Sequence, residues 1–350
     1  MRPAQAPPSF RTKLFYASFA GVSMLIIVFV FYFYQNFYLA NVRTGREPIR
    51  YFIAEQTSFE DLMAAFREER IFENEMSFRL VAKFLKFDTP KPGWYLFEKD
   101  TDNLTAIRML RAGDQIPLRI TFNNIRLPHE LAGKLTQYLK ADSAALLQKL
   151  QNPEIAQKYG FNEQTFLCMF LPNTYEFFWT TDADALLDRM KREYDKFWNE
   201  KRQAQAQERG LSPVEVSILA SIVDAETIHD DEKPKVAGVY LNRLQRGQRL
   251  EADPTVVFAL GDFSIKRVLL KHLEVESPYN TYRNTGLPPG PIRLPSIAGI
   301  EAVLQAEEHD LLFFCAREDF SGYHNFARTA AEHSRNAERY RRALNQRGIR

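Results

Sequence analysis

The chain has 350 residues, with 46 Lys and Arg against 44 Asp and Glu, which gives a formal net charge of +2. Hydrophobic residues make up 45% and charged residues 26%, so the composition excludes a disordered or fibrous protein and allows more than one buried core. The even charge balance argues against nucleic acid as a partner, and two cysteines, Cys168 and Cys315, are too few for a disulfide framework.

An uncharged run near the N-terminus predicts a single transmembrane helix. It extends from Leu14 to Tyr34, which is long enough to cross a bilayer, and it ends in aromatic residues typical of a membrane interface. A cleaved signal peptide would have a shorter apolar stretch and a small-residue cleavage site. We therefore expect a retained helix over 14–34, a cytoplasmic tail over 1–13 and a polar juxtamembrane linker over 35–50. Basic residues flank both ends of the run, so charge counting favours this orientation only slightly.

Residues 51–115 have the pattern of a small α/β module. The predicted elements are two strands and three helices, closed by Gly113: strands Tyr51–Ile53 and Gly93–Phe97, and helices Ser58–Glu69, Met76–Leu85 and Asn103–Leu110. This layout resembles the LysM-like subdomain that glycan-binding envelope proteins carry. The alternative is a spacer that lifts the next domain off the membrane.

A larger domain is expected over 116–350. It opens with a strand at Leu118–Phe122, and helices follow near Pro128–Tyr138, Ser143–Leu150 and Asp182–Arg202. The whole chain is therefore expected to belong to the α+β class, with a single N-terminal transmembrane helix, a small LysM-like α/β module and a larger α+β domain.

One acidic residue of the larger domain is predicted to point into the interior. Ser212 and Glu215 form a capping box around Pro213, so a helix begins there. At helical spacing Glu226 lies close to the apolar stripe in the last turn, whereas Asp224 is expected on the solvent side. Burial and the negative helix end both disfavour ionisation, which would keep Glu226 protonated and able to donate to a leaving oxygen. A structural pairing of this acid with a buried Arg243 is the other interpretation.

The following segments contribute polar residues and rigid loops. A second helix is predicted over Pro234–Leu244, and Asp253 is expected to cap a short helix that begins at Pro254. Two proline-containing stretches, 277–282 and 286–292, are expected to form a rigid loop, and the aromatic, amide and hydroxyl side chains of 277–282 suit the apolar faces and hydroxyl edges of sugar rings. An ordinary proline-rich connector would have a similar composition.

Five sequence blocks, in order and with similar spacing, carry a family resemblance. They are ASIVDAET at 220–227, VAGVYLNRL at 236–244, DPTV at 253–256, SPYNTY at 277–282 and GLPPGPI at 286–292. Together they resemble the YceG-like endolytic murein transglycosylases over about residues 116–345. The chain departs from the family pattern at Asp224-Ala225, where Glu-Lys is common, and at Glu251-Ala252, where Gln-Thr is common. The acid that aligns with the family's catalytic glutamate, Glu226, is intact.

The resemblance implies a lytic transglycosylase, a carbon–oxygen lyase of cell wall assembly. Such an enzyme cleaves the β-1,4 bond between N-acetylmuramic acid and N-acetylglucosamine within peptidoglycan strands, leaves 1,6-anhydro-muramyl ends and can terminate nascent strands. Glu226 would act first as acid and then as base, so no second catalytic carboxylate would be needed, unlike in ordinary glycosidases.

The resemblance also implies a set of substrate contacts. The matching motifs contain Asn242, Asp253, Thr255, Asn280 and Tyr282, and His324 matches a family histidine near the site. The residues alone leave other roles open, because Asp253 can cap a helix, Asn242 can hold a loop carbonyl and His324 can be a structural hydrogen-bonding residue. No cofactor or metal is expected, since the histidines lack metal-ligand spacing.

Two other functions and one other location stay open from the sequence. A hydrolytic muramidase would use Glu251 or Asp253 as a second carboxylate, and an inactive peptidoglycan-binding scaffold would keep the fold alone. The family resemblance implies a bacterial inner membrane protein with a cytoplasmic N-terminus and a periplasmic catalytic domain, whereas a cytoplasm-facing enzyme would be separated from this substrate. The expected partners are peptidoglycan strands, and cell-wall synthases or division proteins. Cys168 and Cys315 either pair or are two small buried apolar residues.

Overall fold

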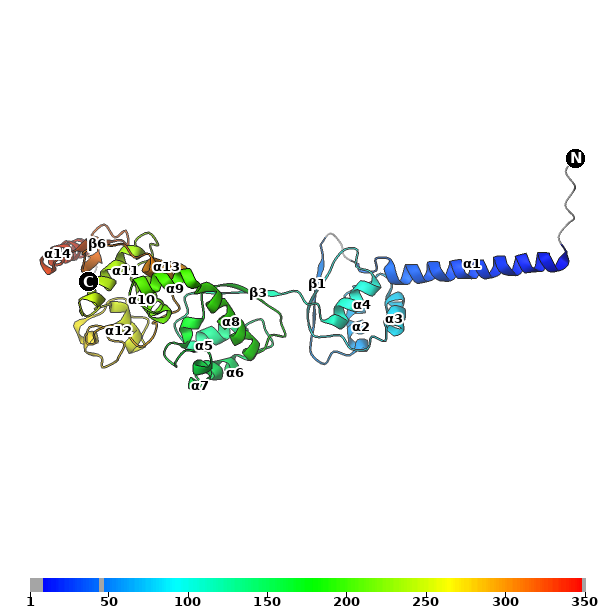
Figure 1. Cartoon of the computed structure of the whole chain (residues 1–350), viewed down its shortest axis with the longest axis horizontal. Coiled ribbons are helices and arrows are strands. Elements are labelled where there is room, and N and C mark those ends of the chain that lie inside the picture. Colours follow the sequence, from blue (N-terminus) through cyan, green and yellow to red (C-terminus); the bar gives the residue numbers. More distant parts are fainter. Residues whose placement is uncertain (1–8, 44–46, 348–350) are drawn as a thin grey trace, which may run out of the picture. The chain divides into compact units, whose positions relative to one another are not determined.

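The computed structural model describes residues 9–43 and 47–347, and it divides into two compact units (Figure 1). The small unit comprises Met1–Leu118 and Phe178–Thr180, and the large unit comprises Arg119–Phe177 and Thr181–Arg350. Both units combine helices with two-stranded sheets, which confirms the expected α+β class. Most of the predicted cytoplasmic tail, part of the predicted linker and the last three residues of the predicted catalytic domain lie outside the described residues.

The N-terminal apolar run forms a helix, α1, at Phe10–Tyr38. It begins at the N-cap Ser9, whose hydroxyl accepts a hydrogen bond from the Thr12 backbone N–H. Among the described residues α1 is the one helix long and apolar enough to span a membrane, and its most apolar stretch is not buried by the rest of the chain. This is the surface that a membrane anchor needs.

The small unit packs three helices against a two-stranded antiparallel sheet. Its elements are β1 (Ile49–Ile53), α2 (Phe59–Glu68), α3 (Glu75–Phe84), β2 (Gly93–Phe97) and α4 (Asn103–Ala112). Tyr51 of β1 pairs with Tyr95 of β2, and aromatic side chains such as Phe66 and Phe78 fill the core. The predicted elements are therefore present, with ends that differ by a few residues.

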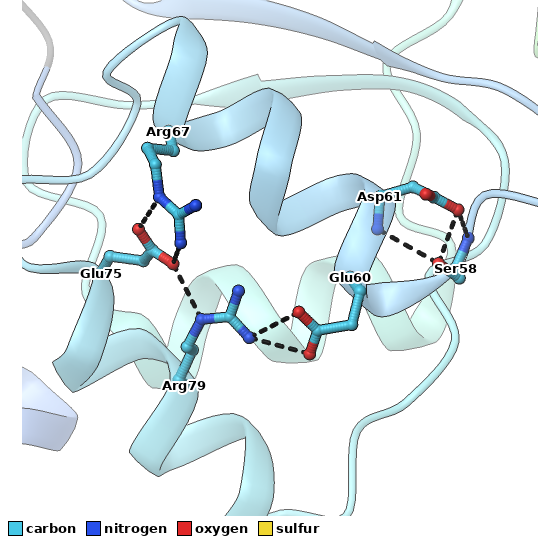
Figure 2. Close-up of polar contacts among 6 residues, drawn as sticks. All are labelled: Ser58, Glu60, Asp61, Arg67, Glu75 and Arg79. Atoms are coloured by element: carbon cyan, nitrogen blue, oxygen red, sulfur yellow. Dashed lines mark hydrogen bonds and ion pairs between the residues drawn. The ribbon is translucent and has the colours of Figure 1, made fainter.

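An ion-pair network joins α2 to α3 in this unit (Figure 2). The Glu75 carboxylate accepts hydrogen bonds from Arg67 over 2.6 and 2.8 Å and from Arg79 over 2.8 Å. Arg79 also donates to both carboxylate oxygens of Glu60. The two cations and two anions alternate, so each charge faces an opposite charge.

The region predicted as a polar linker is largely part of the small unit, so this expectation needs correction. Asn36, Phe37, Asn41 and Val42 are buried. Val42 forms an isolated β-bridge, and the Asn41 side chain donates over 2.7 Å to Asn103. The asparagines that make the segment polar are satisfied by buried hydrogen bonds, which a composition argument cannot distinguish from solvation.

The large unit surrounds one helix, α10 (Pro213–Glu226), whose residues 216–223 are all buried. Before it come β3 (Leu118–Phe122), α5 (Pro128–Thr136), α6 (Ser143–Leu150), α7 (Pro153–Lys158), the 3₁₀ turn η1 (Phe166–Met169), β4 (Asn173–Phe177), α8 (Ala183–Phe197) and α9 (Glu200–Glu208). After it come α11 (Lys233–Gln245), α12 (Asp253–Leu260), the 3₁₀ turn η2 (Leu270–Glu274), α13 (Ile297–Leu304), β5 (Phe313–Ala316), β6 (His324–Ala327) and α14 (Ala330–Gln346).

Two features of this unit refine the sequence expectations. The single helix expected over Asp182–Arg202 is two helices, α8 and α9, because Asn199 accepts a hydrogen bond from the Arg202 N–H and starts a new helix. The proline-rich loop 286–292 is fastened to α10, since the Ile292 N–H donates to Ser221 Oγ over 3.1 Å.

Candidate functional site

The helix that carries Glu226 begins and ends where the sequence predicts. Ser212 Oγ accepts from the Glu215 N–H, and the Glu215 carboxylate accepts from the Ser212 N–H, which completes the capping box. The apolar stripe of α10 is buried, and Glu226 is its last residue. The helix thus places the Glu226 carboxyl group at the end of a buried segment.

The environment of Glu226 favours its protonated form. Burial raises the pKa of this carboxyl to about 7, and the nearby Asp253 charge adds to the effect. Tyr240 of α11 donates a hydrogen bond to Glu226 Oε1 over 2.6 Å and, like the more distant Arg243, opposes the rise in pKa. A carboxyl group in this state exchanges its proton near neutral pH, which suits general acid–base catalysis.

A pocket of about 450 Å³ opens in front of this carboxyl group. Four of the predicted site residues line it: Glu226, Asp253, Tyr282 and His324. The other residues that line it are Tyr240, Arg243, Leu250, Glu251, Phe313, Phe314, Cys315, Ala316 and His333. The wall therefore alternates aromatic faces with charged and polar groups, as a sugar-binding surface requires.

Asp253 and Tyr282 form one side of the pocket together. The Tyr282 hydroxyl donates to Asp253 Oδ1 over 2.6 Å. Asp253 is the first residue of α12, and the N-cap is Ala252, so the predicted capping role of Asp253 is wrong. The carboxylate is held by the tyrosine instead and remains on the pocket wall.

Three predicted substrate contacts are not brought to the pocket. Asn242 donates to the carbonyls of His309 and Leu311, which is the loop-holding role that the sequence left open. Thr255 and Asn280 are completely buried. The Thr255 hydroxyl donates to the Ala252 carbonyl, and the Asn280 amide donates to two carbonyls of the η2 segment. Polar residues in these motifs hold loops as well as lining a groove.

The Asp224 side chain is buried, so the expectation that it faces solvent is wrong. Its side chain is 6% exposed and pairs with Lys233 Nζ over 2.8 Å. It also accepts from the backbone N–H and hydroxyl of Ser296, the N-cap of α13. A Cβ atom at Gly299 would lie 2.6 Å from the carboxylate, so glycine leaves the necessary space. The helical wheel considered α10 alone, whereas α11 and α13 pack around its end.

Arg243 has partners other than Glu226. It forms an ion pair with Glu251 over 3.0 Å and donates to the backbone carbonyls of Leu250 and Leu312. Glu251 adopts a φ of 52°, a left-handed conformation that is uncommon outside glycine. The alternative that Glu226 serves as the structural partner of this arginine is therefore not favoured by the hydrogen bonds.

Sequence reasoning missed several residues of the site. Tyr240 lies on the helix predicted over Pro234–Leu244, but its hydrogen bond to Glu226 depends on how α10 and α11 pack against each other. Phe314 reaches the pocket from β5, where the apolar letters FFCA indicate only a buried strand. In the part of the chain that the structure describes, Cys168 and Cys315 are both free, and no cluster of three metal-ligating side chains is present.

Comparisons with known proteins agree on one family. The model of the YceG-like family matches residues 51–339. A Bacillus subtilis protein named endolytic murein transglycosylase is 27% identical over 308 residues, which cover 83% of this chain and 84% of the relative. A Streptococcus pneumoniae protein of the same name is 24% identical, and the match covers 84% of this chain and 58% of the relative. The crystal structure of a YceG-like protein from Listeria monocytogenes superposes with a TM-score of 0.55 at 25% identity and covers 83% of this chain and 99% of that one.

Proposed function

We propose that this chain, which belongs to the YceG-like family, is a membrane-anchored endolytic lytic transglycosylase that acts on peptidoglycan. The observation that carries the proposal is the state of Glu226. Burial raises the pKa of its carboxyl group to about 7, and the group lies in a pocket lined by aromatic and polar side chains. Its relatives from two bacteria are named for this activity. The bond cleaved would join N-acetylmuramic acid to N-acetylglucosamine within a strand.

The proposed reaction uses Glu226 twice. The protonated carboxyl gives its proton to the glycosidic oxygen, and the bond from that oxygen to the muramyl C1 breaks. The resulting carboxylate then takes the proton of the muramyl C6 hydroxyl, whose oxygen bonds to C1 and forms the 1,6-anhydro ring. Glu226 ends protonated, as it began, and no water is consumed. Tyr240, through its hydrogen bond to Oε1, orients the carboxyl group in both steps.

The other carboxylates of the pocket support a mechanism with one acid. Glu251 is paired with Arg243, and Asp253 accepts the hydroxyl of Tyr282. A second catalytic carboxylate would have to activate water or attack C1, and both groups are already held by partners. A hydrolytic muramidase is therefore the less favoured function.

We further propose an arrangement in the cell. Helix α1 would anchor the chain in a bacterial inner membrane, with the N-terminus in the cytoplasm and the catalytic domain, 116–350, on the periplasmic side. The module over 51–115 would bind glycan in the manner of LysM-like subdomains. The partners would be peptidoglycan strands, together with the cell-wall synthases or division proteins whose nascent strands the enzyme terminates.

The decisive experiment is digestion of intact peptidoglycan by the full chain in detergent. Mass spectrometry should find 1,6-anhydro-muramyl ends, and the fragments should be oligosaccharides of mixed length because cleavage is internal. A product in which most ends carry an added water would contradict transglycosylation and indicate a muramidase. A reporter fused to the C-terminus should be active only in the periplasmic form, and activity of a cytoplasmic reporter would contradict the orientation.

A further inference from the structure

One residue that lines the pocket, His324, is paired with a carboxylate beside the pocket, Glu232. His324 is the first residue of β6 and lines the pocket, while Glu232 directly precedes α11 and is 6% exposed. His324 Nδ1 lies 2.8 Å from Glu232 Oε2, and the backbone N–H of His324 donates to Oε1 over 2.8 Å. One carboxylate therefore binds both the ring and the backbone of the same residue.

This double contact determines which ring nitrogen carries the proton. An ionised carboxylate only accepts hydrogen bonds, so the His324 nitrogen beside it must be Nδ1–H. In the neutral ring Nε2 then keeps its lone pair and acts as an acceptor. Because the backbone of His324 is held by the same carboxylate, the ring cannot turn without breaking the contact.

The pair is also fixed with respect to Glu226. Residues 227–232, which connect α10 to α11, contact the loop before β6 through Tyr323. The His229 ring stacks on the Tyr323 ring with centroids 3.8 Å apart, and the Tyr323 hydroxyl donates a hydrogen bond to Asp231. The Phe314 ring meets His324 edge-on at 5.2 Å and Tyr240 edge-on at 5.7 Å. Phe314 thus stands between the ring of His324 and the tyrosine that holds Glu226.

We propose that His324 accepts a hydrogen bond at Nε2 from the muramyl C6 hydroxyl and aims its oxygen at C1, with Glu232 as the positioning residue. This inference rests on the proposed function. While Glu226 is still protonated, the hydroxyl donates its one hydrogen to His324 Nε2, which places the oxygen beside C1. Once the glycosidic bond breaks and Glu226 is a carboxylate, the hydroxyl proton turns to Glu226 and leaves with it, and the oxygen bonds to C1. A held hydroxyl reacts faster than a water molecule that arrives from solvent, so the pair favours the anhydro product over the hydrated one.

The variant Glu232→Gln tests the role of the pair with little change in shape. The backbone N–H of His324 still needs an oxygen acceptor, so the amide NH₂ of the glutamine faces Nδ1 and donates to it. The proton of the ring then moves to Nε2, which can no longer accept from a hydroxyl. We expect the ratio of hydrated to anhydro ends to rise roughly tenfold, the effect of one lost hydrogen bond.

The measurement is the same digestion by the full chain in detergent, with both product classes quantified by mass. Glu318→Gln is the matched control, since Glu318 accepts a hydrogen bond from Asn325 of the same strand but does not line the pocket. It should keep the wild-type ratio. Nitrogen NMR of the histidine rings should show the proton on Nδ1 in the wild type and on Nε2 in Glu232→Gln.

The possible results separate the two proposals. A slower Glu232→Gln enzyme with the wild-type product ratio would show that the pair is merely structural and would overturn the role of His324. A wild-type product in which hydrated ends predominate would overturn the proposed function, and the role of the pair with it. If Glu232→Gln does not fold, His324→Phe provides the same test, because a phenyl ring has no hydrogen-bond acceptor nitrogen and should raise the same ratio.

Discussion

Two glutamates at helix ends, one in each unit, differ greatly in pKa. Glu75 is the first residue of α3, and hydrogen bonds from Arg67 and then Arg79 lower its pKa to about 2. Glu226 is the last residue of α10, and burial raises its pKa to about 7. The helix ends shift both pKa values in the same directions as these contacts do, because a helix N-terminus favours an anion and a helix C-terminus disfavours one. The same side chain is thus a permanent anion in the small unit and a proton donor near neutral pH in the large unit.

The difference teaches that ion-pair partners and solvent, rather than residue type, decide what an acid can do. The Glu75 network is closed, since each carboxylate faces an arginine and no proton is available for transfer. The hydrogen-bond donor to Glu226 is the neutral Tyr240, which does not compensate a negative charge as an arginine would. Glu226 therefore stays protonated until it can give its proton to the glycosidic oxygen of the substrate. The first arrangement stabilises a fold, and the second costs stability in return for reactivity.

The largest expected effect is on catalysis. Glu226→Gln keeps the size of the side chain but removes the proton that titrates. We expect the rate of peptidoglycan cleavage to fall by roughly 10²–10⁴-fold, the usual contribution of a general acid–base group. The rate is measured as muropeptide release by the full chain in detergent.

Glu75→Gln is the matched control, because it makes the same chemical change in the small unit and should leave the cleavage rate unchanged. Substantial activity in a folded Glu226→Gln protein would remove Glu226 from the catalytic role. A comparable loss in Glu75→Gln would show that the two glutamates are not as different as their surroundings indicate.

The helices, the strands and the position of Glu226 could be predicted from the sequence because their signals lie within a few residues of one another. The capping box at Ser212 and the apolar spacing of one helix were enough to place Glu226 in the last turn of α10. In the small unit, the N-caps Ser58, Asn74 and Asp102 mark the helix starts close to where they were expected. Such signals require contacts only a few residues apart.

The remaining parts of the site depend on contacts between distant segments. Asp224 meets Ser296, and Glu232 meets His324, across gaps of 72 and 92 residues. Neither pairing follows from periodicity, so Asp224 was expected in solvent and Glu232 was missed. Thr255 and Asn280 share sequence blocks with pocket residues but point into the core, because adjacent residues of a turn face different directions.

The next effect concerns stability as a function of pH. Glu226 has a folded pKa of about 7 against an ordinary value of 4.5, so its contribution is fully present below pH 4.5 and is lost as the pH rises through about 7. Glutamine has no proton to lose. We therefore expect Glu226→Gln to match the wild type near pH 4.5 and to be more stable at about pH 8.5, by on the order of 3 kcal/mol.

Hydrogen exchange of peptides from α10, followed through a urea titration of the full chain, measures this local stability. Peptides from α2 and α3 provide the internal control, because the substitution should not change them. A difference between the two proteins that stays constant with pH would contradict the raised pKa of Glu226.

The smallest expected effect is in the small unit. Glu75→Gln removes the charge at the centre of an exposed network in which the Arg67 side chain is 64% exposed, so water and salt screen the interaction. The folded pKa of about 2 lies below the ordinary 4.5, which means that the contribution is present above pH 4.5 and is lost as the pH falls through about 2. At neutral pH we expect a loss of roughly 0.5–1 kcal/mol, measured by hydrogen exchange of α2 and α3, that shrinks in about 1 M salt. The loss of stability could instead exceed the gain expected for Glu226→Gln, or stay the same in high salt. Either result would mean that the Glu75 network behaves as a buried ion pair. The two glutamates would then differ only in the sign of the charges around them.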